Sequence, residues 1–373
     1  MNIRDVKSFH ERRALIEKHL DISLQNVGAL IVDEPDLIHC ENLIGAVSIP
    51  VGVAGPISIT SSGKTTEHFI PLATTEGALV ASVNRGAKVI VQAGGAHVDI
   101  EQVGATRGPV FETSGIVESR RLKRFIEENI ESLKEIAAST SRHLQLLSIH
   151  SRMNGKHVYM RCSFNTDEAM GMNMVTIATD AIVSHIEKNA GTTCLAVAGN
   201  YDVDKKPAWL NFIEGRGRIC SADVVIPAEL VMSQLHIEVY QLVKTVVAKC
   251  WGGSMMSGSM GFNAHFANVV AAFFAATGQD LAHVVEGSLG ITTAEMLENG
   301  DLYFSVTMPD VMLGTVGGGT QLVSQKEARS ITSTESADQL SQVLVAAVLA
   351  GELSLLASIT EKTLGKVHKK LGR

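Results

Sequence analysis

The sequence predicts an α+β fold, in which a helix-rich large domain carries a small inserted α/β sandwich. Apolar residues recur with the helical period from Leu122 to Ile136, whereas apolar and polar residues alternate from Val158 to Phe164. The first pattern is typical of an amphipathic helix and the second of a half-buried strand. Because the period changes between them, we expect a second packing unit there. Further apolar helical stretches occur around 228–250, 263–277 and 335–369.

These elements divide the chain into three parts. Residues 1–35 carry a charged amphipathic pattern and an irregular acidic segment, which predict an N-terminal helical segment. Residues 142–197 hold the alternating strand, a Gly-Met-Asn turn and an apolar helix from about Met172 to Lys188, and they predict the small domain. Residues 36–141 and 198–373 are assigned to the large domain.

Composition limits the classes of function. The chain has 373 residues, of which 45% are hydrophobic and 19% charged, and this balance describes an ordered globular protein. A formal net charge of −7 argues against nucleic acid or an anionic membrane as the main partner. Any anionic ligand must therefore be bound by a local cluster of positive groups.

The cysteines and the apolar stretches indicate a cytoplasmic protein. The five cysteines are scattered and form no C-x-x-C pair, so we expect neither a disulfide framework nor a metal site. The first residues lack the apolar core of a signal peptide. Val343–Ala350 is apolar, but Glu352 follows soon after, and we expect this stretch to fall short of the ~20 residues of a membrane span.

The segment Asp204-Lys205-Lys206-Pro207 places two ammonium groups side by side. Its flanks are rich in turn-forming residues, which predicts a shaped loop rather than a solvated helix face. A loop lysine held near a carboxylate can stabilise a developing oxyanion. The alternative is a surface turn with two solvated lysines.

Three polar residues stand next to apolar segments. Glu76 lies where an apolar element begins, and burial there would favour its protonated form and make it a proton donor; the alternative is a first-turn glutamate favoured by the helix dipole. His265 and Asn268 share one face of an apolar helix, so we expect them to pair with each other or with a ligand.

Asp280 follows Gly278, a predicted helix C-cap, and could project into a cleft and pair with a lysine. A solvated aspartate is the alternative. His368 stands in a basic C-terminal tail, where it could be an ordinary terminal residue or a mobile general acid.

Two glycine-containing stretches, Glu168–Met174 and Gly314–Thr320, are candidates for close backbone approach to a ligand. The first precedes a helix, so its amides could receive a phosphate. Neither is a G-x-G-x-x-G motif, and a Rossmann domain is not supported. The methionines of the first stretch could equally fill the core.

Together these motifs resemble the 3-hydroxy-3-methylglutaryl-coenzyme A (HMG-CoA) reductase family, and the resemblance covers about residues 36–373. Seven motifs occur in the family's order: Glu41–Gly45, Pro50–Pro56, Ala73–Gly77, Met170–Met174, Asp204–Ala208, Gly278–Asp280 and Gly314–Thr320. The resemblance is to class I members of archaeal type. It implies reduction of HMG-CoA to mevalonate and free coenzyme A with two NADPH, and a small cofactor domain of ferredoxin-like type.

The resemblance also implies roles for catalytic residues. Lys205 would stabilise the oxyanion and Glu76 would supply a proton to the reduced carbonyl. Asp280 would tune both groups. His368 would protonate the departing coenzyme A thiolate.

The remaining implied contacts concern substrate and cofactor. By the resemblance, the HMG group would be contacted by Arg142, Asp204, Lys206 and Asn268. The coenzyme A side would be contacted by Glu41 and Asn42. The NADPH site would comprise Glu168, Met170, Gly171, Met172, Asn173, Gly317 and Gly318. Glu168 is a departure, since the family motif commonly begins with Asp. A further departure is Ala198, where a hydroxyl residue is common.

The resemblance further implies a homodimer or a dimer of dimers. Two alternatives stay open. One is an NAD-linked enzyme of this fold that oxidises mevalonate, and the other is a non-catalytic acyl-coenzyme A binding protein.

Overall fold

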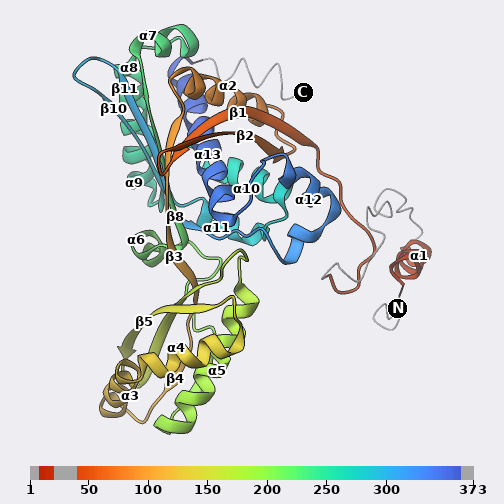
Figure 1. Cartoon of the computed structure of the whole chain (residues 1–373), viewed down its shortest axis with the longest axis vertical. Coiled ribbons are helices and arrows are strands. Elements are labelled where there is room, and N and C mark those ends of the chain that lie inside the picture. The colour runs from red at the N-terminus through yellow and green to blue at the C-terminus, as the bar shows by residue number, and fades with distance from the viewer. Residues whose placement is uncertain (1–7, 21–39, 363–373) are drawn as a thin grey trace.

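A computed structural model describes residues 8–20 and 40–362 of the chain (Figure 1). The expected mixed α+β class is confirmed. Of the predicted N-terminal segment, the described part is helix α1 (Phe9–Leu20). His368 lies outside the described residues.

The larger part of the molecule is built on a mixed sheet that the sequence analysis did not anticipate. Its strands, in spatial order, are β2 (Lys64–Ala73), β1 (Val51–Ser61), β3 (Ala96–Arg107), β8 (Arg216–Ile226), β11 (Leu302–Val311), β10 (Gly290–Met296) and β9 (Gly261–Phe262). Neighbours are antiparallel except for the pairs β1/β3 and β10/β9. A description as simply helix-rich was therefore incomplete.

Apolar helices cover this sheet and form the main core with it. The central ones are α13 (Ala337–Thr360), α2 (Leu79–Gln92), α10 (Phe266–Thr277) and α8 (Val239–Val246). Helices α2 and α13 cross so closely that a Cβ at Gly86 would lie 1.9 Å from the carbonyl oxygen of Ala350. Only glycine permits this approach, so the crossing depends on Gly86.

Helix α13 lies within the helical stretch expected around 335–369, and Glu352 does not interrupt it. Its most apolar window has a mean hydropathy of 2.1, so by length and composition alone it could cross a membrane. However, 83% of that window is buried within the protein. Glu352 is fully buried and accepts hydrogen bonds from His265 and Thr292. The helix is therefore a core helix that holds one compensated carboxylate.

Two predicted helices are broken. The helix expected from Leu122 to Ile136 is two helices, α3 (Ile116–Glu128) and α4 (Ile130–Thr140), separated at Asn129, whose side chain donates to the Phe125 carbonyl at 2.8 Å. The helix expected around 228–250 consists of α7 (Ala228–Leu230), η2 (Val231–Leu235), α8, η3 (Val247–Gly253) and α9 (Ser254–Ser257). Helix α12 (Val323–Ser330) precedes α13.

The smaller sheet contains β5 (Gln145–Asn154), β6 (His157–Asn165), β4 (Val110–Glu112) and β7 (Thr193–Ala196), in that spatial order and all antiparallel. The strand expected over 158–164 is β6, and the helix expected from Met172 to Lys188 is α5 (Met172–Ala190). Strand β3 joins the two sheets, because Ala105–Arg107 pair with β6 and the residues before them pair with β8 (Figure 1).

A second, separate core lies between the smaller sheet and helices α3, α4 and α5. Leu122, Ile126 and Leu133 belong to it, although they precede the boundary that we placed at residue 142. The helical period shows which face of a helix is buried but does not show which sheet it covers, so the sequence could not assign these helices.

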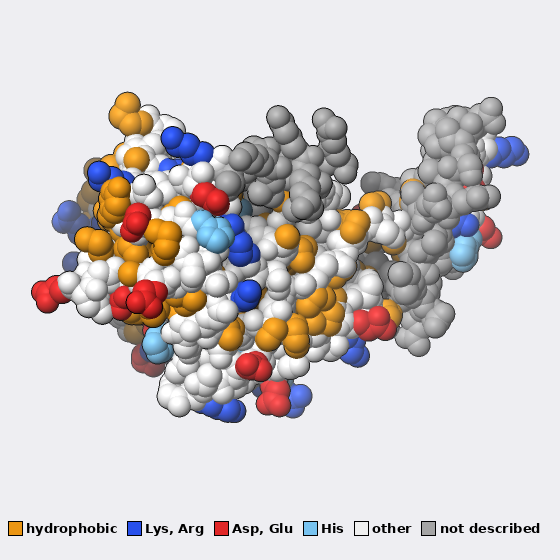
Figure 2. Space-filling view, turned by 90° about the horizontal axis from the view of Figure 1, so that it is seen from above, with side chains coloured by type: hydrophobic (Ala, Val, Ile, Leu, Met, Phe, Trp, Pro, Cys, Tyr) orange, Lys and Arg blue, Asp and Glu red, His pale blue; other side chains and the backbone are white. Residues whose placement is uncertain are grey.

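The surface carries both signs of charge. On the described part of the face seen in Figure 2, Lys, Arg, Asp and Glu side chains are interspersed with apolar ones. This distribution does not form a continuous patch of one sign on that part of the face.

Candidate active site

The lysine loop, defined here as residues 200–208, leads into helix α6 (Trp209–Glu214). The Lys205 ammonium lies 2.7 Å from Oδ2 of Asp280, which confirms the predicted pairing of Asp280 with a lysine. Lys205 has a φ of +56°, in the left-handed region that residues with a side chain rarely adopt. The loop is therefore held in a specific shape.

Asp280 is placed by the end of α10. Gly278 ends that helix with a φ of +75°, as the predicted C-cap requires. The Asp280 side chain then accepts a hydrogen bond from the Ala282 amide at 3.0 Å and so caps the short helix η4 (Leu281–His283). Partial burial acts to raise the pKa of Asp280, but the hydrogen bonds from Lys205 and Ala282 outweigh it, and the pKa is lowered.

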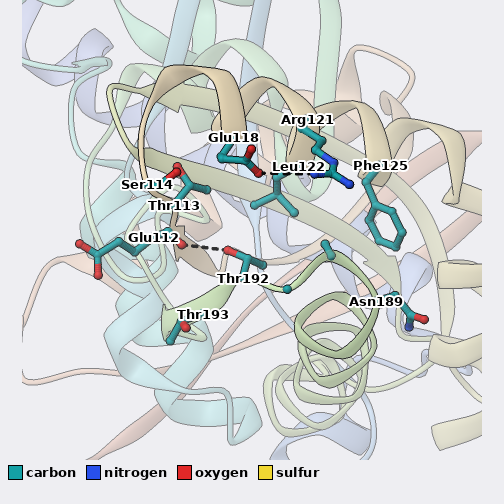
Figure 3. A pocket seen from close by; sticks show the side chains of 12 residues that line it. Glu112, Thr113, Ser114, Glu118, Arg121, Leu122, Phe125, Asn189, Thr192 and Thr193 are labelled. Carbon is teal, nitrogen blue, oxygen red and sulfur yellow. Dashed lines mark hydrogen bonds and ion pairs between the residues drawn. The ribbon is translucent and has the colours of Figure 1, made fainter.

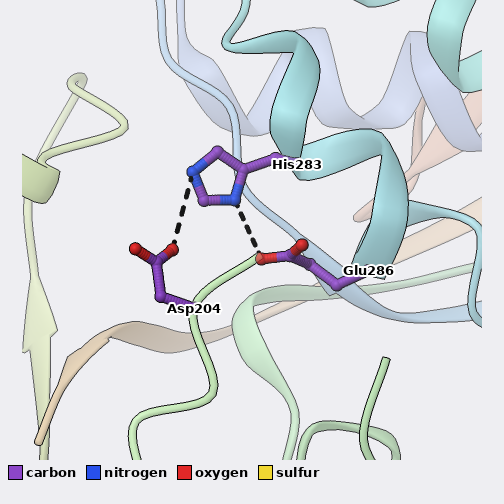
Figure 4. Close-up of side chains that lie close together, drawn as sticks. All are labelled: Asp204, His283 and Glu286. Carbon is purple, nitrogen blue, oxygen red and sulfur yellow. Dashed lines mark hydrogen bonds and ion pairs between the residues drawn. The ribbon is translucent and has the colours of Figure 1, made fainter. Parts of the chain in front are cut away.

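A buried cluster lies beneath the lysine loop, and the sequence analysis missed it. Arg216, which begins β8 and is fully buried, binds Oδ1 of Asp204 at 2.8 Å and Oε1 of Glu286 at 2.6 Å. Nδ1 of His283 lies 2.9 Å from the same Glu286 oxygen, within hydrogen-bond distance. Figure 4 shows Asp204 from the lysine loop and His283 and Glu286 from the segment after α10 converging. The three-residue spacing Asp280, His283, Glu286 was the available signal.

The ligand atoms of Asp204, His283 and Glu286 lie within 4.8 Å of one another, a spacing that could suit a metal ion. The guanidinium of Arg216 already binds two of these three residues. Positive charge is thus supplied to the cluster by the protein itself.

A second layer of buried charges supports this cluster. Arg161 donates to the Asp202 carbonyl at 2.9 Å and to Asn211, and Asn211 donates to Asp310 at 2.7 Å. Burial raises the pKa of Asp202 and raises that of Asp310 well above its usual value, although Arg107 and Arg216 respectively act against this. Desolvation lowers the pKa of Arg161. The residues that pack against the lysine loop therefore form a buried network of polar side chains joined by hydrogen bonds.

Glu76 and Asn268 form another pair, in which the Asn268 amide donates to Oε2 of Glu76 at 2.7 Å. Glu76 is exposed in the single chain, so the burial that we expected for it is wrong. His265 binds Glu352 at 2.7 Å rather than Asn268, which corrects the expected mutual pairing. Glu352 lies 87 residues further along the chain and no local pattern pointed to it.

A cavity of about 550 Å³ gathers most of the residues implied for the cofactor. It is lined by Met170, Gly171, Met172, Asn173, Gly317 and Gly318, and also by Asp280. The first four open helix α5, and the last two lie at the start of helix η5 (Gly318–Gln321). A Cβ at Gly317 or Gly318 would meet no atom of the described residues within 4 Å, so these backbone positions leave room for a ligand. The cavity therefore connects the two glycine-containing stretches with Asp280.

Glu168 does not line that cavity. Its Oε2 accepts hydrogen bonds from the Thr315 hydroxyl at 2.7 Å and from the Ala337 amide at 2.6 Å, at the N-terminus of α13. A carboxylate is favoured at that end of a helix. Glu168 therefore links the α5 turn to the larger part of the molecule.

The other predicted residues are dispersed. Arg142 is exposed and donates to His143 at 3.2 Å, and Lys206 is exposed and donates to the Asp204 carbonyl at 3.3 Å. Glu41 is exposed and Asn42 half-buried, in the segment before β1. The structure thus brings together Lys205, Asp280 and the cavity, whereas Arg142, Glu41 and Asn42 are not among the residues that line that cavity.

Another cavity, of about 480 Å³, lies at the far end of the smaller sheet (Figure 3). Leu122 and Phe125 of α3 point into it, and Thr192 donates to the Glu112 carbonyl at its edge. It contains none of the predicted site residues.

Comparisons with known proteins identify the family. The model of the family described as hydroxymethylglutaryl-coenzyme A reductase matches residues 8–373. The chain is 45% identical over 368 residues to the 3-hydroxy-3-methylglutaryl-coenzyme A reductase of Methanothermobacter thermautotrophicus and 46% identical over 373 residues to that of Methanocaldococcus jannaschii. Each match covers 97% of this chain and 92% of the relative.

Among solved structures, the chain is similar to the class II 3-hydroxy-3-methylglutaryl-CoA reductase of Streptococcus pneumoniae bound to NADPH. The TM-score is 0.71 at 19% identity, with 96% of this chain and 99% of that chain covered. At this identity the likeness supports the fold. The extent of the sequence matches and the order of the motifs show that the chain belongs to the HMG-CoA reductase family.

Proposed function

We propose that this HMG-CoA reductase, an oxidoreductase that produces mevalonate, is a class I enzyme that uses two NADPH per HMG-CoA and releases free coenzyme A. The observation that carries the proposal is the cavity that joins Asp280, paired with Lys205 at 2.7 Å, to the start of α5 and the glycines before η5. The Lys205–Asp280 pair therefore lies next to a cavity that could hold a large cofactor.

Lys205 acts in this proposal as the oxyanion stabiliser. Its ammonium is fixed by Asp280, and the side chain is 39% exposed, so the lysine can approach a substrate carbonyl. Asp280, whose pKa is lowered, stays ionised near neutral pH and holds the ammonium in place. One such donor contributes roughly 3 kcal/mol to transition-state stabilisation.

Protons come from two other residues in the proposal. Glu76 supplies a proton to the reduced carbonyl. Asn268 orients the carboxyl group of Glu76 through the 2.7 Å hydrogen bond and also orients the thioester of the substrate. His368 protonates the coenzyme A thiolate as it leaves. Asp204, Lys206 and Arg142 bind the HMG carboxylate and hydroxyl.

The cofactor site is proposed at the start of α5. NADPH supplies the two hydrides when it is bound. The first turn of the 19-residue helix α5 lines the cavity and offers free amides to phosphate groups. Gly317 and Gly318 allow close approach of the backbone, and Glu168 fixes the turn before α5. Glu41 and Asn42 are proposed on the coenzyme A side.

The domain organisation is proposed as a large substrate domain and a small NADP-binding domain. The strand and helix order β4, α3 and α4, β5, β6, α5, β7, with the spatial order β5-β6-β4-β7, matches the ferredoxin-like β-α-β-β-α-β arrangement. Because Leu122 and Leu133 pack in the second core, we propose that the small domain begins near Ala105.

We further propose a homodimer or dimer of dimers, in the cytoplasm, with an active site completed across the subunit interface. Exposed apolar residues on and just before β1 and β2, namely Val47, Val51, Val53 and Phe69, support an interface there. Sedimentation velocity should show a dimer or tetramer. A fully active monomer would contradict this arrangement.

Cofactor preference separates this proposal from an NAD-linked mevalonate oxidase. With HMG-CoA as substrate, oxidation of NADPH followed at 340 nm should be much faster than oxidation of NADH. Equal or faster rates with NADH would overturn the class I assignment. A non-catalytic acyl-coenzyme A binding protein would show no oxidation of either cofactor.

A further inference from the structure

The backbone of Lys205 is held as specifically as its side chain. A residue with a side chain persists at a φ of +56° only where its surroundings hold it. The Lys205 amide donates a hydrogen bond to Oε1 of Glu286 at 3.0 Å. Glu286 is therefore the described side chain that fixes the backbone of the proposed catalytic lysine.

Oε1 of Glu286 accepts from three sides. Besides the Lys205 amide, it binds Nη1 of Arg216 at 2.6 Å and faces Nδ1 of His283 at 2.9 Å. Glu286, Arg216 and His283 are all fully buried. Hydrogen bonds in such an environment are strong and an unpaired group is costly, so the cluster has one favoured arrangement.

The segment Asp280–Glu286 binds both the side-chain ammonium and the backbone amide of Lys205. Asp280 binds the ammonium and Glu286, six residues later, binds the backbone amide. His283 lies between them, with Nε2 3.8 Å from Asp280 and 3.9 Å from Asp204. Within the described part of the chain this buried nitrogen has no hydrogen-bond partner, so its position is imposed by Nδ1 and by packing.

We propose that Glu286, oriented by His283, is a positioning residue that fixes the backbone of Lys205 and thereby aims its ammonium at Asp280 and the substrate. The part of this inference that concerns catalysis rests on the proposed function of Lys205. The part that concerns the loop is independent of it, because it predicts a structural change that is measurable without substrate.

Two substitutions distinguish the effect of the negative charge of Glu286 from the effect of its side-chain length. Glu286→Gln keeps the length and one acceptor oxygen but removes the charge that Arg216 and His283 face. Glu286→Asp keeps the charge but withdraws the carboxylate by one methylene group, so it no longer reaches the Lys205 amide. His283→Gln removes the ring that orients Glu286. The control is His68→Gln, because His68 is also buried and binds Thr332 and Thr66 through its two ring nitrogens.

The first readout is hydrogen–deuterium exchange of peptides covering residues 200–208, measured by mass spectrometry on the full chain without substrate. Loss of the hydrogen bond should speed exchange of the Lys205 amide by about tenfold in Glu286→Asp. Glu286→Gln keeps an acceptor oxygen but loses the charge that strengthens the bond, so exchange of the same amide should rise by a smaller factor. His283→Gln should give a smaller increase in the same peptides. His68→Gln should leave their exchange within about twofold of the parent.

The second readout is steady-state kinetics. We expect kcat to fall at least tenfold in both Glu286 variants while KM for NADPH stays within about twofold, because the cofactor cavity is not altered. Thermal unfolding identifies a variant that does not fold. If Glu286→Gln is one, Glu286→Asp decides, since it keeps a negative charge opposite Arg216.

The outcomes distinguish the two claims. Parental exchange and parental kcat in the folded Glu286 variants would overturn the positioning role. Faster exchange with parental kcat would overturn its link to catalysis. A parent enzyme that oxidises no NADPH with HMG-CoA would instead overturn the proposed function, while exchange would still decide whether Glu286 holds the loop.

Discussion

Lys205→Ala should separate stability from activity. The Lys205–Asp280 pair joins side chains that are 39% and 33% exposed, and ion pairs of this kind contribute about 0–1 kcal/mol to stability. Alanine keeps the Cβ, so the cost of the positive φ and the backbone hydrogen bond to Glu286 are both unchanged. We therefore expect the free energy of unfolding, measured by urea denaturation, to change by less than about 1 kcal/mol.

Activity should respond far more strongly to the same change. Removing a preorganised donor from an oxyanion costs about 2.7–4 kcal/mol in the transition state, which corresponds to a loss of roughly 10²- to 10³-fold in kcat. Lys134→Ala is the matched control, because the Lys134 side chain is also 39% exposed and lies 2.8 Å from Glu131. It should match Lys205→Ala in stability and the parent in activity.

A kcat of Lys205→Ala within tenfold of the parent would rule out the oxyanion role of Lys205. That role would also be ruled out if the loss of activity merely followed a comparable loss of stability, since the lysine would then act through folding alone. Steady-state assays at saturating substrate and denaturation curves from one preparation distinguish these cases.

Three further predictions concern other residues. His368→Gln should slow reduction of HMG-CoA by about 10²-fold but slow reduction of supplied mevaldehyde far less, since only the thioester route releases a thiolate; equal slowing of both, or parental rates, would contradict its role. Deletion of residues 366–373 should reproduce that pattern in the same two assays. Because burial raises the pKa of Asp310 well above 3.8, the folded chain binds a proton that the unfolded chain releases, and stability falls as pH rises above 3.8. Urea denaturation at a series of pH values above 3.8 should therefore show Asp310→Asn gaining stability relative to the parent as the pH rises. A difference in unfolding free energy that does not change with pH would argue against a buried carboxyl of raised pKa.

The sequence predicted those parts of the fold whose patterns are local. Strand β6 shows the alternation of a strand, and α5 is an apolar stretch that follows a Gly-Met-Asn turn, so both were identified. The larger sheet was missed because its strands lie far apart in the chain and pair over long separations, as β3 does with β8. The break at Asn129 was missed because the apolar period continues across it.

In the candidate site, too, contacts that follow from local patterns could be predicted and long-range contacts could not. The pairing of Lys205 with Asp280 could be predicted, since a glycine C-cap and a turn-rich loop each project a charged group. The cluster beneath them could not, because Arg216 begins a buried strand and looks like part of a turn in the sequence. The exposure of Glu76 was missed because apolar neighbours along the chain do not establish burial.

The stoichiometry of the complete reaction is the most direct test of HMG-CoA reduction by two NADPH in this enzyme. Purified enzyme is given limiting HMG-CoA with excess NADPH, and NADPH consumption at 340 nm is compared with coenzyme A thiol released to a thiol reagent. The account predicts two NADPH oxidised for each thiol released, with mevalonate as the product. One NADPH per thiol, or thiol release without oxidation of NADPH, would contradict it.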